Sequence, residues 1–147
     1  MSGGAASGKT EFLVSHLIQS DVIILDSTLP TVEGASIKIR KIIKAKKVPV
    51  IYAVIPDDLS RAFIAFLHRD RKFSDAHFYR THSNSRKTLL WIAGQYPQIE
   101  VNLIESSYTS NQKLLFKGLK FNDRDELMSH LRSLQLSEAD IIASINI

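Results

Sequence analysis

The sequence has no cysteine among its 147 residues, which excludes disulfide bonds and thiolate metal sites. It has no apolar run near the roughly 18 residues that a membrane span requires. Its first residues carry no apolar signal region. We therefore expect a cytoplasmic protein with no membrane partner.

The composition is that of a globular chain, with 44% hydrophobic and 23% charged residues. The length is enough for one domain with a substantial core. A net charge of +4 suits anionic ligands such as nucleotides. No nucleic-acid motif or set of interleaved aromatic residues accompanies this charge, which argues against nucleic acid as a partner.

Apolar runs and helical patterns alternate along the chain. Short apolar runs predict buried strands at 21–26, 48–55 and 99–104, with a fourth or edge strand at 113–121. Helical periodicity predicts helices at 9–19, 35–47, 59–69, 84–95, 122–134 and 137–145. This alternation predicts a three-layer α/β fold with a mostly parallel sheet. We expect one domain over 1–147, with its core over about 1–108 and a C-terminal strand and helices over 109–147.

The segment GGAASGKT fits the P-loop (Walker A) pattern G-x-x-x-x-G-K-[ST]. The nucleotide-binding residues that it predicts are Gly3, Gly4, Ala5, Ala6, Ser7, Gly8, Lys9 and Thr10. Glycines let the backbone curl so that N–H groups point at phosphate oxygens, Lys9 supplies charge to the outer phosphates, and Thr10 supplies a hydroxyl to Mg²⁺. A flexible glycine-rich tail is the alternative, but Lys9 and Thr10 lead directly into a helical pattern.

Asp26 and Thr28 follow the apolar run at 21–26, at the carboxyl end of a predicted strand. Ligands of open α/β sheets bind at this edge. Asp26 is therefore a candidate for substrate binding and, with Thr10, for holding Mg²⁺, partly through water. The alternative is that these side chains cap a turn or helix.

Arg69 and Arg71 lie in the basic segment HRDRKFSDAHF. In P-loop kinases, mobile arginines close over the phosphates and offset the charge of the transition state. Together with Lys9, they are our candidate catalytic residues. A solvated basic face is the alternative.

The chain resembles the zeta-toxin family of P-loop small-molecule kinases. The matching segments, in order through about residue 108, are GGAASGKTEF, VIILDSTLP, VPVIYAVIPDDLSRAFIAFLHRDR and RKFSDAHFYRTH. The resemblance implies a kinase (a transferase) that uses ATP or GTP with Mg²⁺ and closes an arginine-bearing lid. In the best-known members the acceptor is UDP-N-acetylglucosamine. An antitoxin protein is a further partner that the resemblance allows, although many relatives stand alone.

The resemblance also suggests roles for single residues. Arg71 matches the lid arginine best and Arg69 is next, while Thr28 corresponds to a threonine-containing motif that contacts the acceptor. His82, in the segment FYRTH, is a candidate for contacting a substrate or phosphate. Its alternative role is a polar bridge between lid and body.

Two features depart from the family pattern. Family members place a strand before the glycine loop, where this sequence has Met1 and Ser2. They also carry a catalytic aspartate between the P-loop helix and the segment like VIILDST, for which about ten residues leave no room here. We therefore expect a P-loop kinase-like domain that is incomplete at its N-terminal part, with an unanchored loop and no identifiable general base.

The function that we predict is phosphoryl transfer from ATP or GTP to a small hydroxylated acceptor such as a nucleotide sugar. One alternative is a degenerate nucleotide-binding or interaction protein without kinase activity. Another is a nucleoside or nucleotide kinase, because fold and arginine pattern do not identify an acceptor.

Overall fold

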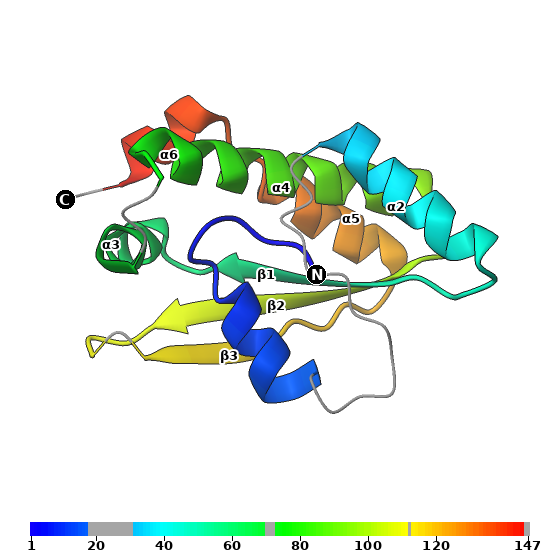
Figure 1. The fold of residues 1–147 in the computed structure, drawn as a ribbon, viewed down its shortest axis with the longest axis horizontal. Helices are drawn as coiled ribbons and strands as arrows, with labels where there is room; N and C mark the ends of the chain where they lie inside the picture. The colour runs from blue at the N-terminus through cyan, green and yellow to red at the C-terminus, as the bar shows by residue number, and fades with distance from the viewer. Residues whose placement is uncertain (18–30, 70–72, 112, 146–147) are drawn as a thin grey trace.

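The computed structural model describes residues 1–17, 31–69, 73–111 and 113–145. Its helices are α1 (Lys9–Phe12), α2 (Val32–Lys44), α3 (Leu59–Arg69), α4 (Asp75–Gln95), α5 (Arg124–Ser133) and α6 (Glu138–Ser144), with a π-helical segment η1 (Leu13–Leu17) continuing α1. Its strands are β1 (Val50–Pro56), β2 (Glu100–Tyr108) and β3 (Leu114–Gly118), as Figure 1 shows. None of the helices in these ranges is both long enough and apolar enough to cross a membrane.

The strands form one sheet in the order β1-β2-β3. β1 and β2 are parallel, with Ala53 opposite Leu103, and the helices α3 and α4 between them provide the crossover that a parallel pair needs. β3 follows β2 too closely for a crossover helix and pairs with it antiparallel, with Ser106 opposite Phe116. The chain is therefore mixed α/β as predicted. The expectation of a mostly parallel sheet is wrong for β3, and the predicted edge strand is confirmed.

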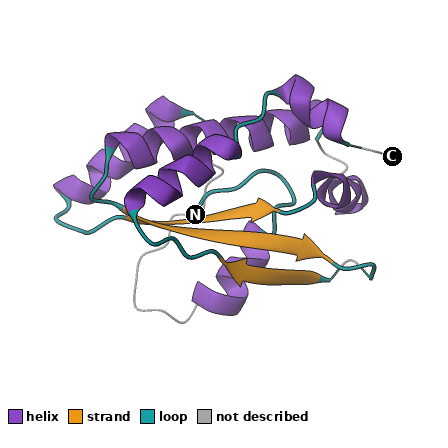
Figure 2. Ribbon diagram, turned by 180° about the vertical axis from the view of Figure 1, so that it is seen from behind, coloured by secondary structure: helices purple, strands orange, loops and turns teal. Residues whose placement is uncertain are grey.

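Helices cover both faces of the sheet because side chains alternate along each strand. Ile51, Ala53 and Ile55 point to one face, where they share a core with residues of α2, α4 and α5. On the opposite face, Val54 and Ile104 pack against Phe12 of α1. In Figure 1 α1 crosses in front of β2 and β3, and in Figure 2, seen from behind, it lies beyond the strands.

Helix α4 corrects the sequence prediction. It begins at Asp75, whereas the apolar pattern predicts a start at Asn84. The added turns look polar in sequence, yet Phe78, Thr81 and His82 in them are buried. The polar side chains of Thr81 and His82 form hydrogen bonds with the N-terminal loop, a partner that composition does not reveal.

The remaining described elements agree with the prediction to within a few residues. Helix α2 begins three residues earlier than predicted because Thr31 caps it, its Oγ1 accepting a hydrogen bond from the Gly34 amide at 3.0 Å. Asp123 and Ser137 cap α5 and α6 in the same way. The strand predicted at 21–26 lies outside the described residues.

Candidate functional site

The glycine-rich loop at residues 3–8 packs closely on the body of the protein. A Cβ atom on Gly3 would lie 2.7 Å from the Val54 carbonyl oxygen of β1. A Cβ atom on Gly4 would lie 2.5 Å from the imidazole ring of His82 on α4. Gly8 has a φ of 93°, a left-handed conformation that favours glycine and turns the chain into α1. The glycine spacing of the motif therefore has a direct structural reason.

The start of the loop is tied to β1, which corrects the expectation of an unanchored loop. The Ser2 amide donates to the Tyr52 carbonyl at 2.7 Å, and the Val54 amide donates to the Ser2 carbonyl at 2.8 Å. Ser2 thus forms a parallel bridge opposite Ala53. This bridge joins the residue directly before the loop to the free edge of β1 in the sheet β1-β2-β3.

Three successive carbonyls of the loop are held by side chains from α4 and β2. The Ala5 carbonyl oxygen lies 2.6 Å from His82 Nε2. The Tyr108 hydroxyl donates to the Ala6 carbonyl at 2.9 Å, and the Ser106 hydroxyl donates to the Ser7 carbonyl at 2.6 Å. The partners are buried, so these bonds are shielded from water and fix the loop conformation.

The carbonyl bonds determine where the loop amides point. In a planar trans peptide the N–H group points opposite to the carbonyl oxygen before it. The Ala6 and Gly8 amides are therefore directed away from His82 and Ser106, and neither takes part in a hydrogen bond among the described residues. The Ala5 amide instead donates to Thr81 Oγ1 at 3.0 Å, and the Ser7 amide donates to the Gly4 carbonyl at 3.2 Å. Among the described residues, the Ala6 and Gly8 amides thus remain available for an anion.

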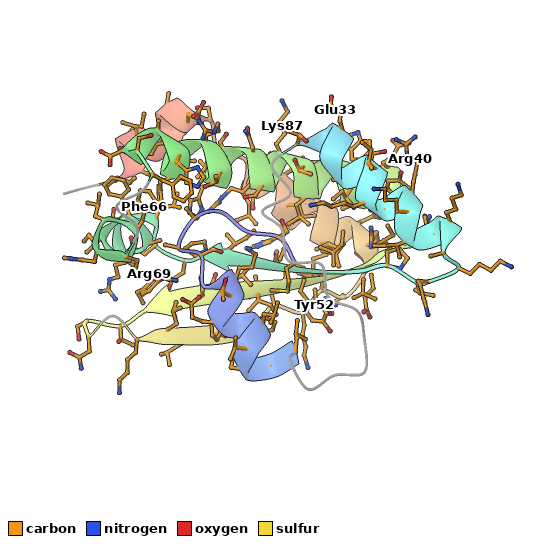
Figure 3. The ribbon with its side chains drawn as sticks, viewed as in Figure 1. Glu33, Arg40, Tyr52, Phe66, Arg69 and Lys87 are labelled. Atoms are coloured by element: carbon orange, nitrogen blue, oxygen red, sulfur yellow. The ribbon has the colours of Figure 1, made fainter. Side chains whose placement is uncertain are left out.

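A cavity of about 260 Å³ lies against the loop. Residues Gly4–Glu11 line it together with Phe66, Arg69 and His77, so Lys9 and Thr10 at the start of α1 both border it. Figure 3 labels Phe66 and Arg69 on α3, the helix beside the loop. The predicted phosphate loop and Arg69, one of the predicted arginines, therefore line the same cavity.

Arg69 is already engaged at this site. Its Nη2 atom lies 2.7 Å from Glu11 Oε1 in α1, and its Nη1 atom lies 3.5 Å from the Tyr108 hydroxyl. Burial is the main cause that raises the pKa of Tyr108, so its hydroxyl stays protonated and able to donate to the loop. A phosphate entering the cavity would meet Arg69 already paired with a carboxylate.

His82 lies behind the loop and is 1% exposed. Because a carbonyl only accepts, Nε2 carries the hydrogen in the contact with Ala5. Burial lowers the pKa of His82 to about 3, so the ring is neutral near pH 7. His82 links α4 to the glycine loop. Its predicted roles, a polar bridge between lid and body or a contact with a substrate or phosphate, stay predictions.

Three predicted site residues, Asp26, Thr28 and Arg71, lie outside the described residues. Within the described ranges, no group of three or more His, Asp or Glu side chains is placed to hold a metal ion. Thr10 borders the cavity, which is compatible with one hydroxyl ligand for Mg²⁺ next to bound phosphates.

Sequence reasoning missed the side chains that support the loop. These are Thr81 and Tyr108, together with Glu11 and Phe66 at the cavity. Ser106 carried a usable signal, since it lies just past the carboxyl end of the strand predicted at 99–104. Comparison with models of protein families and with curated proteins finds no match to this chain.

Proposed function

We propose that residues 3–10 are the phosphate-binding loop of a nucleotide-dependent phosphotransferase, similar to P-loop small-molecule kinases of the zeta-toxin type. The observation that carries the proposal is the triple anchoring of the Ala5, Ala6 and Ser7 carbonyls. It turns the Ala6 and Gly8 amides away from the body, and the loop borders a cavity that also includes Lys9. Preorganised N–H donors beside a lysine are what a phosphate chain requires.

In this proposal the nucleotide, ATP or GTP with Mg²⁺, supplies the transferable phosphoryl group. The loop amides and Lys9 hold the outer phosphates, and the Thr10 hydroxyl is one ligand of the metal. Arg69 offsets negative charge as the phosphoryl group leaves, once it exchanges Glu11 for phosphate. The acceptor is a small hydroxylated molecule such as a nucleotide sugar, and UDP-N-acetylglucosamine is the first to test.

Two observations favour a second candidate, a nucleotide-binding protein without transfer activity. The Ala5 amide is used by Thr81, and Arg69 is paired with Glu11. Both interactions reduce the number of groups that can respond to a transition state. Binding and turnover therefore have to be measured separately.

Titration calorimetry with Mg²⁺-ATP and Mg²⁺-GTP tests the loop. We expect binding by the unchanged chain and its loss in Lys9→Ala, because the lysine neutralises the outer phosphates. Lys87→Ala is the matched control, since Lys87 is exposed on α4 and does not line the cavity. Equal affinity of all three proteins, or no binding by the unchanged chain, would contradict the proposal.

Turnover is measured with labelled nucleotide and a panel of nucleotide sugars and nucleosides. Product with a nucleotide sugar supports the kinase function, and product with a nucleoside alone points to a nucleoside kinase. Nucleotide binding without product from any acceptor supports the second candidate.

A further inference from the structure

A second cavity, of about 460 Å³, lies between the carboxyl ends of β1 and β2 and the helices α4, α5 and α6. It has no lining residue in common with the loop cavity. Its walls combine apolar side chains, among them Ile55, Leu103 and Leu134, with the guanidinium of Arg86. The proposed phosphate chemistry uses none of these groups.

Arg86 is a buried cation that has no counter-ion among the described residues. It is 6% exposed, and burial lowers its pKa to about 10, so it stays charged near pH 7. Its Nη1 atom donates to the Leu134 carbonyl at 3.0 Å, while the buried Nε atom has no partner. No carboxylate in the described part of the chain lies within 4.0 Å of it. An unpaired buried charge is costly, and an anion in the cavity would offset that cost.

Arg124 is a buried guanidinium that differs from Arg86 at its Nη atoms, since the Nε atoms of both have no partner. Its Nη1 atom donates to the Ile99 carbonyl at 2.8 Å, and its Nη2 atom donates to the carbonyls of Ala93 and Tyr96 at 3.0 and 3.2 Å. Both Nη atoms of Arg124 therefore donate to backbone carbonyls. Arg86 has one such bond among the described residues, from Nη1, and borders a cavity, so its Nη2 atom is left for a ligand.

The rim of the cavity has the opposite charge. Asp57, Asp58 and Glu105 line it, and the Ser107 hydroxyl holds Asp57 Oδ2 at 2.6 Å. Asp58 is paired with Arg61 at 3.7 Å. Asp57 and Glu105 are therefore the carboxylates that repel a multiply charged anion such as phosphate and attract an ammonium group. A ligand with one carboxylate, one ammonium group and an apolar chain matches the guanidinium, the rim and the walls together.

We propose that this cavity binds a small aliphatic amino acid, whose carboxylate pairs with Arg86 and whose ammonium group faces Asp57 and Glu105. Its side chain lies against Ile55, Leu103 and Leu134. Three probes of one carbon skeleton separate these contributions: L-leucine, 4-methylpentanoate without the ammonium group, and 3-methylbutylamine without the carboxylate.

The experiment is titration calorimetry of the full chain with each probe and with inorganic phosphate. We expect L-leucine to bind most tightly, 4-methylpentanoate more weakly, and the amine and phosphate weakest. Arg86→Met keeps the side-chain length and removes the charge, so L-leucine affinity should fall roughly tenfold or more. Arg132→Met, at an exposed arginine of α5, should leave the affinity unchanged.

Glu105→Gln provides a second variant in case Arg86→Met does not fold. It should reduce the advantage of L-leucine over 4-methylpentanoate and leave 4-methylpentanoate binding intact. The proposal is overturned if L-leucine does not bind, or if it binds Arg86→Met as tightly as the unchanged chain. Equal affinity for L-leucine and 4-methylpentanoate, or tighter binding of phosphate, overturns the amino-acid assignment.

Discussion

The guanidinium of Arg69 lies 2.7 Å from the carboxylate of Glu11, and both side chains border the loop cavity. Glu11 follows directly after the Lys-Thr pair of the phosphate loop, while Arg69 ends α3. Glu11 thus forms an ion pair with Arg69, the arginine that a phosphate in this cavity would otherwise attract. In the proposed function, Glu11 and phosphate compete for the same cation.

Glu11→Gln should therefore increase affinity for Mg²⁺-nucleotide by about two- to fivefold, because the ion pair is partly exposed and worth at most about 1 kcal/mol. Titration calorimetry measures the change. Glu33→Gln, on the exposed side of α2, is the control and should have no effect. Weaker binding by Glu11→Gln would show that Glu11 helps to hold the nucleotide.

Gly4→Ala should displace the loop, because the added Cβ would lie 2.5 Å from the buried His82 ring. We expect a loss of about 1–3 kcal/mol in the free energy of unfolding, measured by urea denaturation, together with weaker nucleotide binding. Gly118→Ala is the matched control, since nothing lies within 4 Å of its added Cβ. A Gly4→Ala protein as stable as the control would mean that the ring has room to move.

Tyr108→Phe should lower the free energy of unfolding by about 1 kcal/mol, because the Ala6 carbonyl loses its 2.9 Å hydrogen bond in a buried place. The loop should also bind nucleotide less tightly, since one of its three carbonyl anchors is gone. Tyr96→Phe, at the carboxyl end of α4, is the control. Denaturation and calorimetry on both variants distinguish a local effect on the loop from a general effect of removing a hydroxyl.

Stability should fall in acid because of His82. The pKa of His82 is about 3 in the folded chain and about 6.5 when unfolded, so between these values the unfolded chain binds more protons. This contribution is fully present above pH 6.5 and is lost as the pH falls toward 3, by up to about 1.4 kcal/mol per pH unit.

Urea denaturation at pH 7.5, 6.0 and 5.0 measures the slope of the free energy of unfolding against pH. His82→Gln should show a shallower slope because the side chain no longer titrates. His68→Gln, at an exposed histidine of α3, should keep the slope of the unchanged chain. Identical slopes for all three proteins would place the acid sensitivity in other groups.

Local pattern predicts much of the secondary structure and the loop that lines the first cavity, but not the side chains that hold this loop. Isoleucines at helical spacing are enough to predict α2, and the run VPVIYAVI is enough to predict β1. The sequence pattern misses the first turns of α4 because they bury Thr81 and His82 against the loop, with which both form hydrogen bonds. A periodicity argument counts apolar residues and therefore misses a helix face built from polar ones.

The sequence by itself determined the α/β alternation, most helix ends and the glycine loop, because spacing and capping act over a few residues. The tertiary structure alone decided what holds the loop. The partners of Ala5, Ala6 and Ser7 lie 76 to 102 residues further along the chain and meet the loop only when α4 and β2 pack beside β1. The same packing leaves Arg86 without a counter-ion in the described part of the chain, which only the positions of its neighbours in the fold reveal.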